Sequence, residues 1–247
     1  MRVPPNLTLP GLLALIALAA VLLYLERDGG GGSPAPRSAT SPQTTALRPD
    51  AASGAFDYYS LVLSWSPTHC ESPEGQDDHA QCAPRNGRRY AFILHGLWPQ
   101  YERGYPEDCP AKTTWVPQPV IDDMLDVMPS RGLIIHEYRK HGTCSGLSPE
   151  AYYRTARRLY DSLTIPQRFR NPTAAQFLDP DDAVDAFVAA NPQLKPDMVA
   201  VACRGPGSRL REVRICFSKA GVPRSCGVNE DQGKLCRSAR MHVPPVR

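Results

Sequence analysis

The sequence lacks several features that would each indicate a particular class of protein. No Cys-x-x-Cys pair occurs among the 8 cysteines, and this absence argues against a zinc site. No internal repeat is visible, so a repeat architecture is not indicated. The formal net charge of +3 is too small to indicate nucleic-acid binding from charge alone. Any interaction with nucleic acid must therefore be argued from specific residues.

Histidine is scarce, with 6 residues in a chain of 247. Three of them fall in two short motifs, Phe-Ile-Leu-His-Gly-Leu-Trp-Pro-Gln at residues 92–100 and His-Glu-Tyr-Arg-Lys-His-Gly-Thr-Cys-Ser at residues 136–145. The zinc-protease pattern is missing, because it needs histidines four positions apart on a helix and His136 and His141 are five apart. The two motifs are therefore the main candidates for a functional site.

The apolar run near the N-terminus, residues 12–25, has only 14 residues, whereas a membrane-spanning helix needs about 20. This length fits the apolar region of a signal peptide, and extension to residues 7–25 gives a membrane anchor as the alternative. Both alternatives stay open. Either one predicts export to the periplasm or the extracellular space, because a positive charge precedes the run. We assign residues 1–28 to this segment.

Residues 29–54 form a predicted flexible linker, because 16 of these 26 residues are Gly, Pro, Ser or Thr. All 8 cysteines lie beyond it, in the predicted folded domain of residues 55–247. In an exported protein an even number of cysteines favours disulfides, although the spacing alone does not choose the pairing.

The predicted domain mixes strands and helices without strict alternation, which indicates an α+β fold. We expect strands at residues 58–65, 89–94, 198–203 and 212–217, and helices at residues 119–128, 134–141, 148–163 and 181–190. The second strand should deliver His95 at its end, with Gly96 and Pro99 marking a turn. The helix that carries His136 should close at Gly142.

Helical spacing gathers chemically active side chains in the second motif. Positions four apart share a helix face, so His136 should lie beside Lys140, and Glu137 beside His141. Two imidazoles suit acid–base catalysis near neutral pH, and an ammonium group neutralises developing negative charge. Each motif alone has a simpler explanation, such as a solvated helix face, but their joint occurrence favours a catalytic site.

At these residues the sequence resembles a known family. Residues 92–100 resemble the first active-site segment of the ribonuclease T2 family, and residues 136–144 resemble its second. The strand at residues 61–70 looks like the family's opening strand in its bacterial form. The resemblance implies an α+β fold with a central antiparallel sheet packed by helices and braced by disulfides. It also implies RNA cleavage without a metal or cofactor, through a 2′,3′-cyclic phosphate that is then hydrolysed to a 3′-phosphate.

The resemblance also implies roles for individual residues. His95 and His141 form the acid–base pair, with His141 as the base and His95 as the acid. His136 holds the phosphate, while Glu137 and Lys140 stabilise the transition state. We expect Trp98, Gln100 and Tyr105 to contact a base; the Trp98 ring offers a flat stacking surface.

The family pattern further implies the disulfides Cys109–Cys144, Cys203–Cys236 and Cys216–Cys226, with Cys70–Cys82 as the remaining pair. The sequence departs from the family at Gln100, where many eukaryotic members carry an aspartate that contacts the base. It also departs at the two isoleucines before His136. These departures leave every catalytic group in place and lead us to expect low base specificity.

Two alternatives belong to other functional classes. The domain could bind RNA or a partner without turnover, or it could be a phosphodiesterase acting on cyclic or dinucleotide substrates. The intact catalytic set favours the endoribonuclease. We expect a monomer that contacts a membrane only through an uncleaved N-terminal segment.

Overall fold

The computed structural model describes residues 53–83 and 87–247. The predicted leader or anchor at residues 1–28 lies outside the described residues, as does the linker up to residue 52. Among the described residues, no helix is both long enough and apolar enough to cross a membrane.

The strands are β1 (Tyr58–Trp65), β2 (Phe92–Gln100), β3 (Gln176–Leu178), β4 (Val199–Arg204), β5 (Arg209–Ser218) and β6 (Met241–Val243). The α-helices are α2 (Ser66–Cys70), α3 (Pro73–Gln76), α4 (His79–Cys82), α5 (Gln118–Met124), α6 (Arg131–Lys140), α7 (Pro149–Asp161), α8 (Pro180–Ala190) and α9 (Gln232–Leu235). Short 3₁₀ helices lie at Gly142–Ser145, Gln167–Phe169, Pro196–Met198 and Val228–Glu230.

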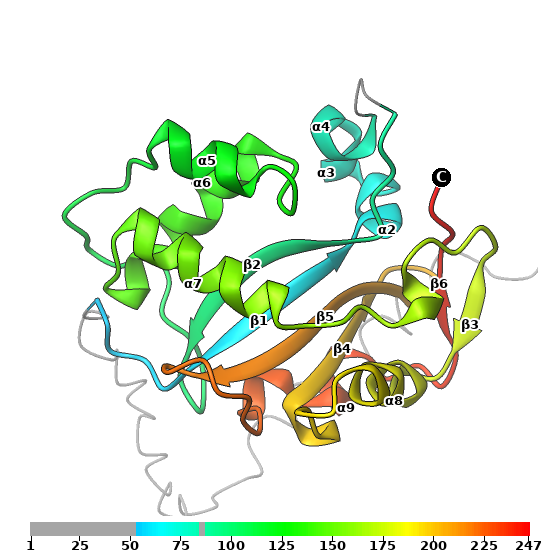
Figure 1. Cartoon of the computed structure of the whole chain (residues 1–247). Coiled ribbons are helices and arrows are strands. Elements are labelled where there is room, and N and C mark those ends of the chain that lie inside the picture. Colours follow the sequence, from blue (N-terminus) through cyan, green and yellow to red (C-terminus); the bar gives the residue numbers. More distant parts are fainter. Residues whose placement is uncertain (1–52, 84–86) are drawn as a thin grey trace, which may run out of the picture. The chain divides into compact units, whose positions relative to one another are not determined.

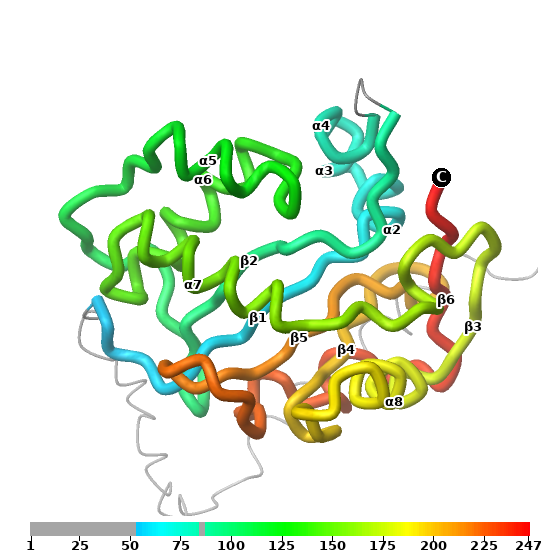
Figure 2. The backbone as a smooth tube through the Cα atoms, viewed as in Figure 1, coloured from blue at the N-terminus to red at the C-terminus, as the bar shows by residue number. Residues whose placement is uncertain are grey.

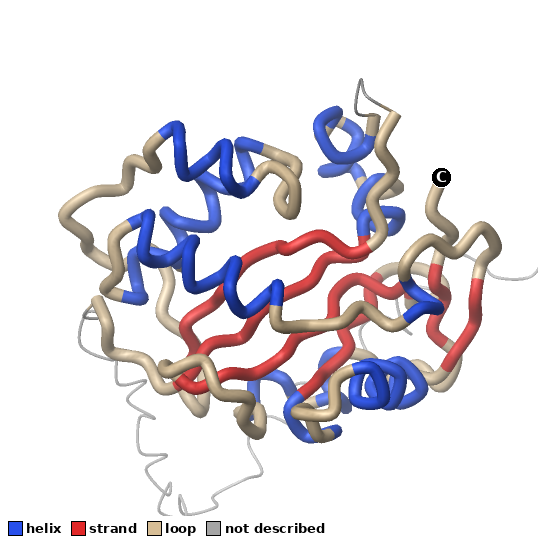
Figure 3. Tube along the Cα trace, viewed as in Figure 1, coloured by secondary structure: helices blue, strands red, loops and turns tan. Residues whose placement is uncertain are grey.

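The sheet has the strand order β2-β1-β5-β6-β3, and β4 also pairs with β5. Strands β2, β1, β5 and β4 are joined by antiparallel pairing. Helices α5, α6 and α7 gather near β1 and β2, while α8 and α9 lie beside β4 (Figure 1, Figure 3). The α+β prediction is confirmed. Figure 2 shows how β2 and β5, far apart in the sequence, flank β1.

Strand β2 differs from its prediction. We expected a strand that stops before His95 and a turn at Gly96 and Pro99, but β2 runs through all three residues. Its register with β1 shifts between Val62, opposite Gly96, and Leu63, opposite Leu94. His95 is therefore the extra residue of a β-bulge. Pro99 is tolerated because β2 lies at the edge of this sheet.

The outer side of β2 is closed by hydrogen bonds from outside the sheet. The Tyr152 hydroxyl of α7 donates to the Leu97 carbonyl at 2.8 Å and accepts from the Leu97 amide at 3.3 Å. The Leu94 amide donates to the Val127 carbonyl at 2.9 Å. Helix α7 begins as predicted, because the Ser148 side chain caps it by accepting from the Ala151 amide. These bonds hold the helical layer against the strand that carries the first motif.

The end of α6 also differs from expectation. The helix stops at Lys140, His141 is its C-cap, and a 3₁₀ turn follows. Gly142 does not adopt the left-handed conformation, which occurs instead at Gly146 (φ 75°). Gly142 is required for close packing, because a Cβ there would lie 2.4 Å from the Tyr138 ring. The second motif therefore turns sharply just after the helix.

An aromatic cluster forms part of the core. Trp65 packs edge-on against Phe92 with ring centroids 4.8 Å apart, and Phe92 contacts Phe187 at 5.8 Å. Phe169 stacks on Phe187 at 5.9 Å. All four side chains are buried, so this cluster ties the start of β2 to α8.

The four disulfides in the structure are the pairs that the family resemblance implies: Cys70–Cys82, Cys109–Cys144, Cys203–Cys236 and Cys216–Cys226. Cys109–Cys144 joins the loop after β2 to the turn after α6. Next to it, the Asp108 amide donates to the Lys140 carbonyl at 2.8 Å. This disulfide therefore braces the two motifs against each other.

Candidate active site

One face of the sheet forms the floor of the candidate site. Strand β1 contributes Ser60, Val62 and Ser64 to this face, because alternate residues of a strand point the same way. Trp98 lies opposite Ser60 on β2, and Glu212 lies opposite Ser64 on β5. The small side chains of the central strand leave room for the larger polar groups on either side.

All eight predicted site residues line one cavity of about 390 Å³: His95, Trp98, Gln100, Tyr105, His136, Glu137, Lys140 and His141. The same cavity is lined by four residues that the sequence analysis did not identify: Glu107, Arg211, Arg214 and Asn229. A neighbouring cavity of about 1060 Å³ shares His95, His136 and Arg211 with it. The two motifs thus meet in one site, and His95 and His136 lie at the boundary between the two cavities.

The Glu137 carboxylate links the two motifs. Helix α6 carries this side chain to the face of β2, where it is 1% exposed. Its Oε2 accepts a hydrogen bond from Trp98 Nε1 at 2.6 Å, and its Oε1 lies 3.4 Å from His95 Nε2. A Cβ on Gly96 would lie 2.0 Å from Glu137 Oε2. Only glycine at this position leaves the carboxylate where it is.

His95 lies between two carboxylates. Its Nε2 faces Glu137, and its Nδ1 lies 3.6 Å from Glu212 Oε1. Burial lowers the pKa of His95, but the charges of Glu137 and Glu212 outweigh burial, and this pKa lies above its ordinary value. Burial raises the pKa of Glu137, but the charges of His95 and His141 and the hydrogen bonds from His95 and Trp98 together outweigh burial and keep that pKa below its ordinary value. The two carboxylates therefore favour the imidazolium form of His95.

His141 has the opposite protonation preference. Burial lowers the pKa of His141 to about 4, and the nearby Glu137 carboxylate only partly opposes this effect. The His141 ring stacks on Trp98 with centroids 4.9 Å apart, and its backbone amide donates to the Glu137 carbonyl. The Nδ1 atoms of His95 and His141 are both buried and have no hydrogen-bond partner among the residues that the structure describes. Nε2 is therefore the candidate nitrogen for proton transfer in each ring.

Two imidazoles whose pKa values are shifted in opposite directions in one cavity are the arrangement that acid–base chemistry near neutral pH requires. The shifts favour a proton on His95 and a free electron pair on His141. The Trp98 indole separates the two rings, since it contacts His95 edge-on at 5.3 Å and stacks on His141. The arrangement suits transfer of one proton in and one proton out at neighbouring atoms.

Lys140 and His136 of the second motif lie nearer the surface than Glu137 and His141. Lys140 is partly exposed, and its Nζ lies 3.3 Å from Glu107 Oε2. His136 is exposed and lines both cavities. Both side chains are accessible to an anion that enters between the cavities.

The three residues expected to contact a base differ in how open they are. Trp98 is stacked by His141 and lies under the Arg214 guanidinium, whose Cζ is 5.0 Å from the ring centroid. Gln100 is buried, and its Oε1 accepts from Asn229 Nδ2 at 3.0 Å. Tyr105 is 55% exposed and presents an open ring. Tyr105 is thus the most accessible of the three aromatic or amide groups.

The sequence analysis missed the contribution of β5. This strand was expected, but the polar side chains at alternate positions, Glu212 and Arg214, were not assigned to the site. They lie on the same face as Trp98, and Arg214 Nη2 binds Glu212 Oε2 at 2.9 Å. The available signal was a pair of opposite charges at positions that alternate with the apolar Val213 and Ile215.

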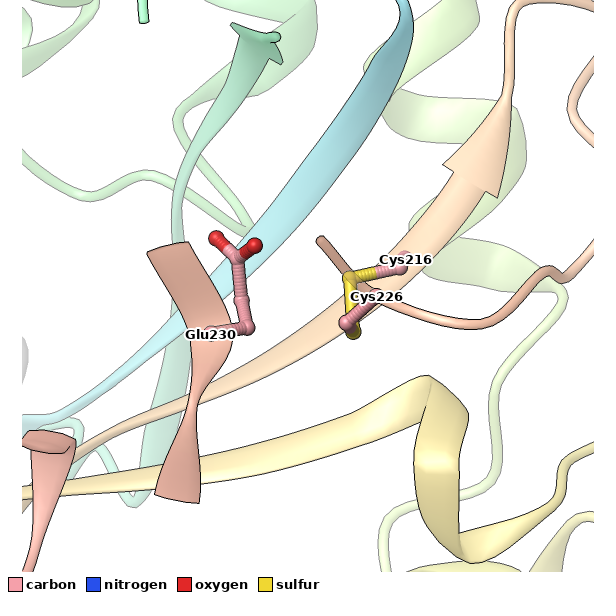
Figure 4. Close-up of side chains that lie close together, drawn as sticks. All are labelled: Cys216, Cys226 and Glu230. Carbon is pink, nitrogen blue, oxygen red and sulfur yellow. A yellow bond between two sulfur atoms is a disulfide. The ribbon is translucent and has the colours of Figure 1, made fainter. Parts of the chain in front are cut away.

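Three side chains of types that bind metals come together elsewhere in the described part of the chain: Cys216, Cys226 and Glu230. Figure 4 shows the two sulfur atoms joined in a disulfide, with the Glu230 carboxylate beside them. Neither sulfur is a thiolate, and Glu230 accepts a short hydrogen bond from the Tyr58 hydroxyl. This cluster does not have the donor set of a metal site.

Comparison with known proteins agrees with this geometry. The model of the ribonuclease T2 family matches residues 56–226. A ribonuclease of Aeromonas hydrophila is 36% identical over 180 residues, which cover 72% of this chain and 80% of that protein. Ribonuclease DdI of Dictyostelium discoideum is 30% identical over 200 residues, covering 74% and 82%. RNase NT, solved in complex with 5′-AMP, matches 77% of this chain and 98% of its own with a TM-score of 0.55 and 21% identity.

Proposed function

The chain belongs to the ribonuclease T2 family, and we propose that it is an exported endoribonuclease that cleaves single-stranded RNA by attack of the 2′-hydroxyl on the adjacent phosphorus. The observation that carries this proposal is the pair formed by His95 and His141. The two imidazoles line one cavity and have pKa values shifted in opposite directions. DNA lacks the 2′-hydroxyl and is not a substrate for this reaction.

In the first step, His141 Nε2 takes the proton from the 2′-hydroxyl. The 2′-oxygen forms a bond to phosphorus, and the bond from phosphorus to the 5′-oxygen of the next nucleotide breaks. His95 Nε2 donates its proton to that leaving oxygen. The products are a 2′,3′-cyclic phosphate and a free 5′-hydroxyl, and the two histidines have exchanged protonation states.

In the second step the roles reverse. His95, now neutral, takes a proton from a water molecule that attacks the cyclic phosphate. The water oxygen bonds to phosphorus, the bond from phosphorus to the 2′-oxygen breaks, and His141, now protonated, returns its proton to that oxygen. The product is a 3′-phosphate, and the enzyme returns to its starting state.

Negative charge develops on the phosphate oxygens during both steps. We assign stabilisation of this charge to Lys140, whose ammonium group is accessible at the cavity mouth. His136 holds the phosphate in place. Glu137 stabilises the transition state indirectly. It holds Trp98 by a hydrogen bond, and its negative charge stabilises the positive charge of His95.

Base binding falls to Trp98, Gln100 and Tyr105, and we propose low base specificity. The Gln100 amide is engaged by Asn229, which leaves fewer free groups to discriminate base edges. The exposed Tyr105 ring suits stacking, and stacking is tolerant because every base has a flat face. Stacking contacts with little edge readout would accept all four bases.

The protein is proposed to act outside the cytoplasm, since four disulfides are typical of an oxidising compartment. We also propose that it acts as a monomer. In this proposal residues 1–28 direct export or retain the domain at a membrane, residues 29–54 are the linker, and residues 55–247 are the catalytic domain. No metal or cofactor takes part in the proposed reaction.

The test is cleavage of mixed RNA by the purified, oxidised protein in excess EDTA, with product ends identified by mass spectrometry. We expect cyclic phosphate ends, and a rate at least ~100-fold lower in His95→Ala and in His141→Ala. A nucleoside 3′-(4-nitrophenyl phosphate) separates their roles, because its leaving group departs without a proton. His95→Ala should recover most of its activity on this ester, and His141→Ala should not.

Three outcomes would contradict the proposal. Cleavage abolished by EDTA would indicate a metal-dependent reaction. Tight RNA binding by the folded protein without cyclic ends would indicate a binding module. Cleavage of dinucleotides but not of polymeric RNA would indicate a phosphodiesterase of small substrates.

A further inference from the structure

A row of charges with alternating sign crosses the sheet beneath the candidate site. It runs from Glu137 through His95, Glu212 and Arg214 to Glu230, with closest approaches of 3.4, 3.6, 2.9 and 3.8 Å between successive members. The catalytic scheme above uses the first two members. The middle member, Glu212, has no part in it.

Glu212 is an unusual residue for its position. It lies on β5, between Ser64 of β1 and Ala202 of β4, and its side chain is fully buried. A buried carboxylate is unfavourable unless cations compensate it. Here the compensation comes from two neighbours on its own strand, since Arg214 Nη2 lies 2.9 Å from Oε2 and Arg211 Nε lies 3.1 Å from Oε1. Glu212 is therefore held as an anion.

This anion faces the buried nitrogen of His95. Glu212 Oε1 lies 3.6 Å from His95 Nδ1. Arg211 pairs with Oε1 by charge but makes no hydrogen bond to it, and neither Oε1 nor Nδ1 has a hydrogen-bond partner within the described part of the chain. Because Nδ1 is buried, substrate reaches His95 only through Nε2. Catalytic hydrogen bonds are often long in the free enzyme and tighten when substrate binds.

We infer that Glu212 is the positioning residue of His95: it accepts from Nδ1–H, so that Nε2 is the nitrogen that gives its proton to the leaving 5′-oxygen. This inference rests on the proposed function. Incoming RNA displaces Nε2 from Glu137, while Glu212 keeps the ring oriented and favours the imidazolium. Arg214 holds the Glu212 carboxylate by a hydrogen bond and also lies over the Trp98 ring. Arg214 therefore links Glu212 to the rest of the site.

The groups that face His95 come from α6, from the C-cap of that helix and from β5. Glu137 lies on α6 and His141 caps that helix, while Glu212 and Arg211 lie on β5. Two of these groups, Glu137 and Glu212, are anions that raise the pKa of His95. Their joint effect therefore sets the pH at which kcat falls on the basic side of the pH profile. Loss of the Glu212 charge should lower the pKa of His95 while Glu137 remains in place.

The test uses Glu212→Gln, which keeps the shape and removes the charge. We expect the basic limb of kcat to move to lower pH by about one unit, so that kcat above the limb falls about tenfold while KM is unchanged. Glu212→Asp restores a carboxylate and should return the limb toward the parent value. The matched control is Glu230→Gln, which removes another buried carboxylate beside Arg214 that does not contact His95; it should leave the limb in place.

The inference is wrong if the limb of Glu212→Gln coincides with that of the parent protein, or if its rate falls equally at every pH. Titration of the His95 ring by NMR separates this failure from that of the proposed function, because it needs no turnover. Thermal melting identifies a variant that does not fold, and Glu212→Asp then carries the NMR comparison. If the parent protein does not cleave RNA while the His95 pKa still falls in Glu212→Gln, the proposed function fails and the anchoring contact stands.

Discussion

Replacing Gly96 by alanine should disrupt the site from inside the strand. The added Cβ would lie 2.0 Å from Glu137 Oε2 and 2.7 Å from Trp98 Nε1, whereas ordinary contacts begin at 3.4 Å. Relief of the first contact alone needs a movement of about 1.4 Å, the difference between 3.4 and 2.0 Å. The 2.6 Å hydrogen bond between Trp98 and Glu137 cannot survive such a shift unchanged.

A displacement of about 1 Å at catalytic groups typically lowers the rate about 100-fold, which corresponds to about 2.7 kcal/mol of transition-state stabilisation. We expect a loss of this size in kcat for Gly96→Ala, measured as initial rates on saturating RNA. Loss of the charge-assisted hydrogen bond should also lower the free energy of unfolding by about 2 kcal/mol, measured by urea denaturation.

Two controls make the reasoning refutable. Gly132→Ala lies on α6, where the added Cβ would be 3.7 Å from Ser130 Oγ, and it should leave the rate unchanged. In a Glu137→Ala background the main clash is gone, so adding Gly96→Ala should cost much less than it does in the parent protein. A Gly96→Ala rate within threefold of the parent, or equal costs in both backgrounds, would refute the role assigned to this glycine.

Three further predictions concern pH and the disulfide brace. The profile of kcat/KM should fall at low pH as His141 protonates near its pKa of about 4, and at high pH as His95 loses its proton above 6.5; limbs in other positions would contradict the acid–base assignment. Between pH 6.5 and 4 the imidazole of His141 binds a proton in the unfolded chain but not in the folded chain. As the pH is lowered through this range, the free energy of unfolding of the parent should therefore fall by about 3 kcal/mol more than that of His141→Asn, measured by urea titration at each pH. Removing the Cys109–Cys144 disulfide, which spans 35 residues, by alanine at both positions should lower the free energy of unfolding by about 4 kcal/mol; unchanged denaturant midpoints would argue against the brace.

Local spacing was enough to predict part of the site. The helical period places Lys140 one turn after His136, and both residues lie on α6 as expected. The same reasoning put Glu137 and His141 on one helix face, but His141 lies beyond the helix and contacts Glu137 through its backbone amide. Helical spacing predicts neighbours only where the chain is helical, and α6 stops at Lys140. The chain then turns at Gly142, which packs closely against Tyr138.

The remaining features depend on how distant strands pair. In a regular strand His95 and Trp98 would point to opposite faces, because they are three positions apart. The bulge at His95 brings their rings within 5.3 Å, and that bulge exists only in the register with β1. Glu212 joins the site through the pairing of β5 with β1, which no short motif records. Sequence motifs identified the candidate groups, while strand pairing decides which of them lie close together.

The closed outer side of β2 affects the behaviour of the protein in solution. A bare edge strand offers amides and carbonyls to any other extended chain, and such edges lead to aggregation. Here the Tyr152 hydroxyl occupies both polar groups of Leu97, and the Val127 carbonyl takes the Leu94 amide. Pro99 offers no amide, and the bulge breaks the regular spacing of those that remain. The strand that positions His95 and Trp98 is thereby protected from pairing with a second extended chain.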